Sequence, residues 1–278
     1  MDGPVTEQPL REAVSQQHDD MPDAVPVPHL LVPHLGETAL LLDIDGTLLD
    51  LAPTPREVWV PPDLLTTLKL LRAKTSGALA LVSGRSLNDI DLIFAPEEFS
   101  AVGGHGSEMR LTTGNDAASM IAPRLDSELK RRLAAIARLS PGILLEDKGY
   151  SLALHYRLAP YAETAIREAI ALIQSDLPDA PIEVLPGKSV FEVKHSAVSK
   201  ASGVRELMTR APFCGRRPLF IGDDVTDESV FEIMPEFDGT AFSVGQRVRS
   251  VAGHFDTPSD VRKFLARLTS EASATAGP

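Results

Sequence analysis

The chain has 278 residues, of which 39 are acidic and 27 basic, so its formal net charge is −12. This balance argues against a nucleic-acid partner, because such binding depends on basic side chains that neutralise phosphates. No apolar run approaches the roughly 18 residues of a membrane span, and the N-terminus has no secretory signal pattern. A single cysteine, Cys214, excludes an internal disulfide. We therefore expect a cytoplasmic protein of a reducing compartment, without membrane partners and acting as a monomer.

Both ends of the chain differ in composition from its middle. Six of the 22 prolines fall within residues 1–36, and no sustained hydrophobic periodicity is visible there. Such a segment buries too little apolar surface to offset the entropy of ordering, so we expect a disordered or loosely attached extension. Its histidines, His18, His29 and His34, are irregularly spaced, which disfavours a metal site. The small and polar residues 269–278 predict a flexible tail.

The next part of the chain alternates apolar runs with amphipathic helices. Apolar runs occupy 39–43, 78–83 and 99–103, and Leu64, Leu68 and Leu71 form one stripe of a helix predicted over 62–75. The pattern returns with a helix over 199–209, an apolar run over 218–222, a short helix through Val230 and a run over 241–244. This alternation predicts an α/β fold with a doubly wound parallel sheet that is buried on both faces.

Residues 112–195 follow a different pattern. Helices predicted over 127–139 and 162–175 carry apolar stripes. Between them, Leu152, Leu154 and Tyr156 point to one side of a strand, and Ala153, His155 and Arg157 to the other. Such alternation is typical of a half-buried antiparallel sheet. We therefore predict a Rossmann-like core made of residues 37–111 and 196–268, with an α+β domain, residues 112–195, inserted between its halves.

The strongest chemical signal is Asp43-Ile44-Asp45-Gly46-Thr47-Leu48, which follows the first predicted strand. The carboxyl end of a parallel strand faces the crevice in which α/β sheets bind ligands, so two carboxylates there can share a site. Asp43 can act as a nucleophile that forms an aspartyl-phosphate. Asp45 can protonate the leaving oxygen and then deprotonate a water molecule. The alternative is a turn in which both acids are solvated.

A second acidic strand end, Ile221-Gly222-Asp223-Asp224-Val225-Thr226-Asp227, would lie beside Asp43. Grouped carboxylates suit Mg²⁺, which typically takes one or two of them together with substrate phosphate. The expected metal ligands are Asp43, Asp45, Asp223 and Asp224. Asp223 is the preferred one, because it is nearest to the strand. The same motif can also start a helix, with Thr226 or Asp227 as the N-cap.

Two weaker motifs complete the pattern. Ser83-Gly84-Arg85, at the end of the second predicted strand, offers a hydroxyl and N–H groups that can hold a phosphoryl group, although this tripeptide is more often a turn. Lys200 begins a predicted helix and can balance phosphate and carboxylate charge, although a lone lysine there is usually solvated.

The order acid pair, serine, lysine, acid pair resembles the haloacid dehalogenase superfamily of aspartate-nucleophile phosphotransferases. Further motifs look like the trehalose-6-phosphate phosphatases, and the resemblance covers about residues 38–268. These motifs are Gly104-His105-Gly106 with Glu108, Leu145-Glu146-Asp147-Lys148-Gly149, Leu154-His155-Tyr156-Arg157 and Gly187-Lys188-Ser189-Val190-Phe191-Glu192-Val193-Lys194.

The resemblance implies Mg²⁺-dependent hydrolysis of trehalose 6-phosphate, with the inserted domain as a cap that selects the substrate. Asp43 would be the nucleophile, Asp45 the general acid/base and Asp223 a further Mg²⁺ ligand, while Ser83 and Lys200 would bind the phosphoryl group. The residues expected to contact the substrate are Gly84, Arg85, His105, Glu146, Lys148, Arg157, Lys188 and Glu192.

Two positions depart from the family pattern. His195 follows Lys194 where the family usually has proline, which leaves the details of cap closure open, and Ala201 follows Lys200 where glycine is usual. Alanine is the better helix former, so the second departure is compatible with a helix start at Lys200.

Several alternatives stay open. The same chemistry could act on another sugar phosphate, such as sucrose 6-phosphate, if Glu146, Lys148 and Glu192 lay far from the active cleft. A catalytically silent sugar-phosphate binding module is disfavoured, because the nucleophile, acid/base, lysine and metal acid are all present. The polar strand face around Glu192 could be a solvated surface. His155 and Arg157 could be a pair that stabilises the fold, and His105 could simply occupy a tight turn.

Overall fold

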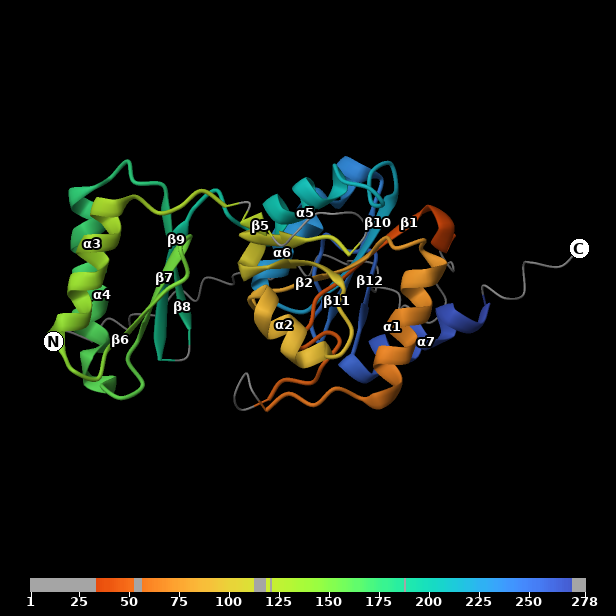
Figure 1. Ribbon diagram of the computed structural model, residues 1–278, viewed down its shortest axis with the longest axis horizontal. Helices are drawn as coiled ribbons and strands as arrows, with labels where there is room; N and C mark the ends of the chain where they lie inside the picture. The colour runs from red at the N-terminus through yellow and green to blue at the C-terminus, as the bar shows by residue number, and fades with distance from the viewer. Residues whose placement is uncertain (1–33, 53–56, 113–118, 121, 188, 272–278) are drawn as a thin grey trace, which may run out of the picture.

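The computed structural model describes residues 34–52, 57–112, 119–120, 122–187 and 189–271. Figure 1 shows two layered units side by side. The larger unit has a sheet with helices on both faces, and the smaller unit has two helices on one face of a second sheet. In the part of the chain described, no helix has both the length and the apolar character needed to cross a membrane.

The larger sheet has eight strands in the order β12-β11-β10-β1-β2-β3-β4-β5. Its strands are β1 (Thr38–Leu42), β2 (Leu79–Val82), β3 (Ser100–Gly103), β4 (Glu108–Arg110), β5 (Ser119–Met120), β10 (Arg217–Gly222), β11 (Thr240–Val244) and β12 (Gly253–Phe255). All neighbouring strands from β12 to β3 pair in parallel, whereas the β3–β4 and β4–β5 pairings are antiparallel. The chain winds outward from β1 in one direction and from β10 in the other. The crevice at such a reversal is where α/β sheets bind ligands.

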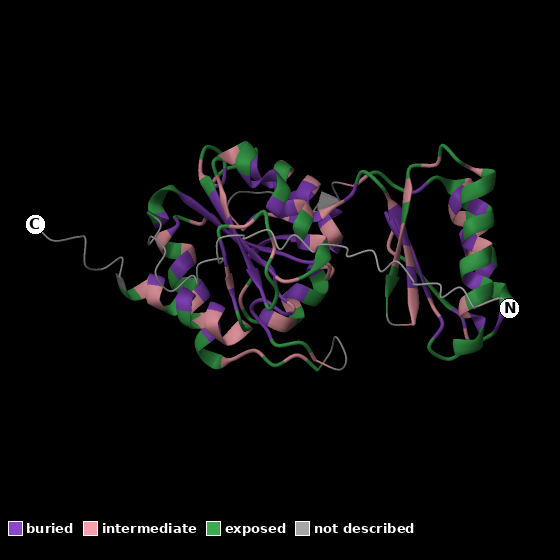
Figure 2. Cartoon of the chain, turned by 180° about the vertical axis from the view of Figure 1, so that it is seen from behind, coloured by how far each residue is buried: buried purple, intermediate pink, exposed green. Residues whose placement is uncertain are grey.

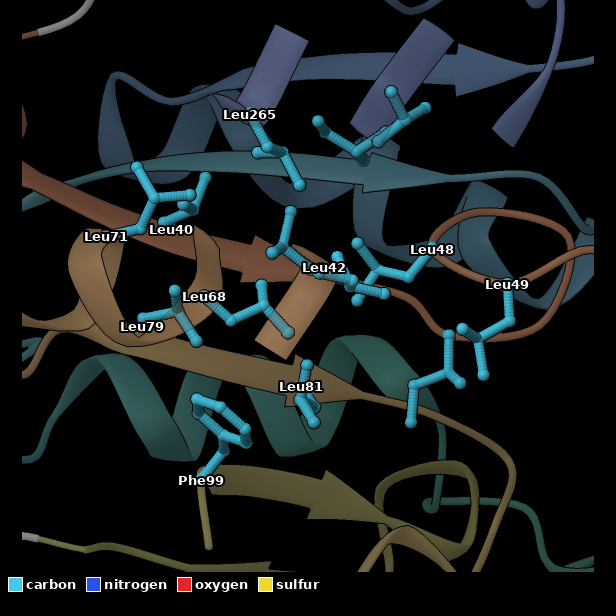
Figure 3. Packing of buried hydrophobic residues seen from close by; sticks show 14 of the residues in the cluster. Leu40, Leu42, Leu48, Leu49, Leu68, Leu71, Leu79, Leu81, Phe99 and Leu265 are labelled. Carbon is cyan, nitrogen blue, oxygen red and sulfur yellow. The ribbon is translucent and has the colours of Figure 1, made fainter. Parts of the chain in front are cut away.

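Helices cover both faces of this sheet, which confirms the predicted doubly wound architecture. They are α1 (Pro62–Lys74), α2 (Leu87–Phe94), α5 (Lys200–Met208), α6 (Val225–Ile233) and α7 (Pro258–Glu271). Leu40 and Leu42 of β1 lie in a cluster with α1, α2 and α7, which Figure 3 shows around Leu68 and Leu265. Leu41, between them, packs on the opposite side with α5 and α6. An apolar run buried on both faces thus becomes a central strand.

The smaller sheet is antiparallel throughout, in the order β6-β7-β9-β8. Its elements are β6 (Leu144–Asp147), β7 (Ser151–His155), β8 (Ile182–Gly187), β9 (Val190–His195), α3 (Ser127–Ile136) and α4 (Glu163–Asp176). Leu152, Leu154 and Tyr156 pack with α3 and α4, as the alternation predicts. Figure 2 shows this buried layer between sheet and helices. The other face of the sheet is turned toward the larger unit.

Some boundaries differ from those predicted. β5 pairs with β4, so residues 119–120 belong to the larger sheet, although the inserted domain was expected from residue 112. Leu35 is 5% exposed and lies in the core of the larger unit, so the N-terminal extension ends before residue 36. α7 continues to Glu271, into the expected tail. The remainder of the extension, residues 1–33, lies outside the described residues.

The two units are joined closely after β9. Residues 196–199 lead directly from His195, the end of β9, to Lys200, the first residue of α5. The Ser199 hydroxyl accepts the N–H of Ser202 at 3.1 Å, and the Ser202 hydroxyl accepts the N–H of Ser199 at 2.9 Å. This reciprocal cap starts the helix at Lys200.

Candidate active site

The carboxyl ends of β1 and β10 bring two acids together. Leu42 pairs with Ile221, and the N–H of Asp43 donates to the carbonyl of Ile221 at 3.0 Å. Asp43 and Asp223 therefore lie on neighbouring strands beside one cavity of about 730 Å³. The cavity is shared between the units, since Asp43, Ser83 and Lys200 of the larger unit and Glu146 and Lys148 of the smaller unit all line it.

Lys200 binds two carboxylates at once. Its ammonium group lies 2.8 Å from Asp43 Oδ1 and 2.7 Å from Asp227 Oδ1. The side chains of Lys200 and Asp43 are 4% and 5% exposed, and that of Asp227 is fully buried. Although burial opposes the charge of Lys200, the attraction of Asp43 and Asp227 raises its pKa above the ordinary value. Lys200 therefore stays positively charged, as its expected role of balancing phosphate and carboxylate charge requires.

Three carboxylates, those of Asp43, Asp223 and Asp227, offer oxygens that lie within 4.8 Å of one another. Asp43 Oδ2 is buried without a hydrogen-bond partner among the described residues. Burial, together with the negative charges of Asp43 and Asp227, raises the pKa of Asp223 to about 8. Burial and Asp43 likewise raise the pKa of Asp227 to about 7. An excess of carboxylate oxygens over nearby cations fits a hard divalent ion such as Mg²⁺.

Gly46 allows this close grouping. Its backbone is left-handed, with φ of 78°, and a Cβ atom there would overlap the carboxylate of Asp223. A residue with a side chain would therefore be strained and would displace Asp223. The hydroxyl of Thr47 lies 3.4 Å from Asp223 Oδ1.

Asp227 is the site residue that sequence reasoning assigned only to a helix start. Its Oδ2 accepts the N–H groups of Asp223 and Asp224, each at 3.1 Å, while Oδ1 holds Lys200. The N-cap of α6 is Asp224, which corrects the expectation of Thr226 or Asp227. The sequence does hold a feature that points to this role, because Asp227 stands three residues after the N-cap Asp224. From this third helical position an acidic side chain can reach back to the N–H groups at the end of the strand.

Two of the four expected metal ligands have other partners. Both oxygens of Asp45 are bound by Arg85, from Nε to Oδ2 and from Nη2 to Oδ1, each at 2.6 Å. Asp224 is exposed, and its side chain accepts the N–H of Val225 at 2.6 Å. The structure groups Asp43 with Asp223, whereas the side chains of Asp45 and Asp224 lie outside the carboxylate cluster, because an arginine and a helix end engage them.

Ser83, Gly84 and His105 form one wall of the cavity. Ser83 is buried, and its hydroxyl accepts the N–H of Arg85 at 3.1 Å. A Cβ atom at Gly84 would overlap the ring of His105, so the glycine lets that ring approach. His105 has φ of 54°, and its Nδ1 is buried without a hydrogen-bond partner among the described residues. Burial lowers the pKa of His105. The residue thus occupies a tight turn and also faces the cavity.

The smaller unit contributes charged groups to the opposite wall. Lys148 Nζ lies 3.4 Å from Glu192 Oε1, and the Ser151 hydroxyl donates to that oxygen at 2.6 Å. Although burial opposes the charge of Glu192, Lys148 lowers its pKa. Glu146 and Lys148 line the cavity, whereas Glu192, which contacts Lys148, is not among its lining residues. Glu146 also contacts His155, at 3.0 Å between Oε2 and Nε2.

Among the expected substrate residues that the structure describes, Arg157, like Glu192, does not line the cavity. Arg157 is exposed and follows the end of β7, so it does not share the strand face predicted for it. His155, for which a fold-stabilising pair with Arg157 was one alternative, contacts Glu146. Lys188 lies outside the described residues.

Comparison with known proteins agrees with this geometry. A trehalose-phosphatase family model matches residues 41–266. A probable trehalose-phosphate phosphatase of Sinorhizobium fredii is 42% identical over 239 residues, which cover 84% of this chain and 88% of that protein. The trehalose-6-phosphate phosphatase of Escherichia coli is 35% identical over 231 residues, 83% of this chain and 86% of that protein.

Solved structures show the same fold. The C-terminal domain of Candida albicans trehalose-6-phosphate phosphatase superposes with a TM-score of 0.67 at 20% identity, covering 90% of this chain and 99% of that one. The family model matches most of the chain, and the two sequence relatives are 42% and 35% identical to it over more than four fifths of its length. The chain therefore belongs to the trehalose-phosphatase family.

Proposed function

We propose that this chain is a Mg²⁺-dependent phosphatase that hydrolyses trehalose 6-phosphate to trehalose and phosphate, through an aspartyl-phosphate on Asp43. One observation carries the proposal. Asp43, Lys200 and Asp223 meet at the strand-order reversal, in the cavity whose other wall holds Glu146 and Lys148. The names of the two sequence relatives support the choice of substrate. A cytoplasmic location and a monomeric state stay predictions.

In the proposed first step, a carboxylate oxygen of Asp43 attacks phosphorus, and the bond from phosphorus to the sugar oxygen breaks. Asp45 gives its proton to that oxygen, so trehalose leaves as a neutral alcohol. Because Arg85 holds both oxygens of Asp45, one of these two contacts has to give way when Asp45 carries its proton, while the other keeps the carboxyl group oriented.

In the proposed second step, Asp45 takes a proton from a water molecule whose oxygen attacks phosphorus. The bond between phosphorus and Asp43 breaks, and inorganic phosphate leaves. Lys200 stays charged and neutralises the phosphoryl oxygens, while Asp227 keeps its ammonium group in place. Ser83 and the N–H groups beside it would hold the same oxygens.

Asp43 and Asp223 would hold the metal ion, because both oxygens of Asp227 are already engaged. When bound, Mg²⁺ supplies positive charge that stabilises the phosphoryl group during transfer. Without it, the cluster carries three carboxylates against the single ammonium group of Lys200.

We assign the larger unit to catalysis and the smaller unit to substrate selection. Glu146 and Lys148 present charged hydrogen-bonding groups to the part of the cavity away from Asp43, where the sugar of the substrate would lie. Hydrogen bonds between hydroxyls and charged groups are stronger than those between neutral groups. Glu192 would act through Lys148, which it orients.

The test is phosphate release from trehalose 6-phosphate, sucrose 6-phosphate, glucose 6-phosphate and an aryl phosphate, with Mg²⁺ or with a chelator. We expect a chelator-sensitive preference for trehalose 6-phosphate, and Asp43→Asn should abolish release while the protein stays folded. Equal rates on all substrates would remove the trehalose assignment and keep the chemistry. No release from folded protein would favour the silent binding module.

A further inference from the structure

Tyr150 belongs to the smaller unit, but its side chain is buried where the two units meet. It lies at the tip of the β6–β7 hairpin, which turns at Gly149 with φ of 86° and closes with Lys148 N–H donating to Ser151 O at 3.0 Å. A hairpin tip is ordinarily solvated. Tyr150 is nevertheless 1% exposed, and it is among the largest fully buried side chains of the described residues.

The ring of Tyr150 packs against the turn formed by residues 104–107 of the larger unit. A Cβ atom at Gly104 would overlap both the Tyr150 hydroxyl and Ser107 Oγ, so these two groups close over the glycine. The Ser107 hydroxyl donates to the carbonyl of Gly104 at 2.7 Å, so it closes the turn against which the Tyr150 ring packs.

This contact links the two walls of the cavity. The 104–107 turn carries His105, whose ring lies against Gly84 beside the phosphate-binding Ser83. The hairpin carries Glu146 and Lys148, the residues proposed to meet the sugar. The Tyr150 contact therefore fixes the distance between the phosphate end and the sugar end of one cavity.

We propose that Tyr150 is a positioning residue, which holds the sugar-recognising hairpin against the 104–107 turn and so sets the affinity for the sugar part of the substrate. Its partners are Gly104 and Ser107, neither of which takes part in the proposed phosphoryl transfer. Removing the ring should therefore weaken binding of the sugar phosphate and leave the chemical step unchanged. This inference rests on the proposed function.

The test is Tyr150→Leu, which removes the ring that packs on Gly104. We expect KM for trehalose 6-phosphate to rise about tenfold, because the hairpin loses its support against the 104–107 turn, while kcat stays within about twofold. An aryl phosphate, which has no sugar to place, should be hydrolysed with unchanged kcat/KM. An unchanged KM for trehalose 6-phosphate, or an equal loss on both substrates, overturns the proposal.

Two further variants separate positioning from folding. Tyr150→Phe keeps the ring and its packing on Gly104, so it should leave KM for trehalose 6-phosphate within about twofold of the wild-type value. Tyr156→Leu is the matched control, because Tyr156 is also a buried tyrosine of the smaller unit but packs on the helix side, stacked on Phe191. It should leave KM unchanged.

The wild-type protein separates this inference from the proposed function. Its preference among the four substrates tests the function, whereas the ratio of KM between Tyr150→Leu and wild type, on the best sugar phosphate, tests the positioning role. A wild type that prefers glucose 6-phosphate would overturn the trehalose assignment alone. A ratio near one would overturn the role of Tyr150 alone.

Discussion

Arg85 holds Asp45 by two parallel hydrogen bonds, each 2.6 Å long. Their side chains are 13% and 31% exposed, so the pair lies in the wall of the cavity and is partly shielded from solvent. Arg85 follows β2 and Asp45 follows β1, so neighbouring strand ends set the geometry. The proposed acid/base is thus held in one orientation before substrate arrives.

Replacing Arg85 by lysine should be almost as harmful as replacing it by alanine. A lysine provides a point charge but no planar fork, so neither variant fixes both oxygens of Asp45. We expect kcat/KM for trehalose 6-phosphate to fall about 10- to 100-fold in each, the typical cost of misplacing a catalytic group. Steady-state kinetics measures this. Wild-type activity in Arg85→Lys would show that the fork does not matter.

Asp223→Asn should raise the melting temperature of the metal-free protein at pH 8. The pKa of Asp223 is raised to about 8, so between about pH 4 and this value the folded state binds a proton that the unfolded chain releases. The contribution of this group to stability therefore falls as the pH rises through that range, and an amide avoids the loss. Thermal unfolding at pH 5 and pH 8 should show the advantage of the variant growing with pH.

The same variant should lose the response to metal. Wild type should melt at a higher temperature with Mg²⁺ than with a chelator, because the ion binds the folded state only. Asp223→Asn should melt at one temperature under both conditions and should show no Mg²⁺-dependent phosphate release. A metal-induced rise that survives the substitution would place the ion elsewhere.

Mg²⁺ binding to the wild type should release protons at pH 7. Carboxylates must be deprotonated to bind a metal, and the pKa of Asp223 is raised to about 8 and that of Asp227 to about 7. The apparent affinity should therefore increase from pH 6 to pH 8 and level off above it. Calorimetric titration in two buffers of different ionisation enthalpy counts the protons. Zero release at pH 7 would contradict the raised pKa values.

Lys148→Met and Glu192→Gln should each raise KM for trehalose 6-phosphate about tenfold or more, since a charge-assisted contact is lost in either case. Their effects should not add, because Glu192 contacts Lys148 at 3.4 Å and acts through it. The aryl phosphate should be hydrolysed normally. Lys69→Met is a matched control, because Lys69 pairs with Glu97 at 2.8 Å and neither residue lines the cavity. Equal losses on both substrates would indicate a structural role.

The grouping of the proposed catalytic residues was predictable, because buried parallel strands end at one edge of the sheet. Asp43, Ser83 and Asp223 each follow an apolar run, so their proximity required only the topology that the alternation of strands and helices implies. Which side chains would form hydrogen bonds with each other in the site was not predictable in the same way. That Arg85 would hold Asp45 depends on side-chain reach between strand ends, which no spacing along the chain encodes.

The misses have local causes. β4 and β12 have three residues each, too few to show a period of two. Arg157 continues an alternating pattern in the sequence, but β7 ends before it. Tyr150 is a lone aromatic residue beside a glycine, and its burial depends on Gly104 in the other unit, so no pattern around it predicts an interior position.

The short connection between β9 and α5 has a mechanical consequence. Residues 196–199 leave almost no slack between the smaller sheet and Lys200. A movement of that sheet would therefore be passed on to the start of the helix whose Lys200 ammonium group contacts Asp43. The proposed sugar contacts and the charge beside Asp43 are thus mechanically linked through residues 196–199, and inserting a few glycines there should weaken this link.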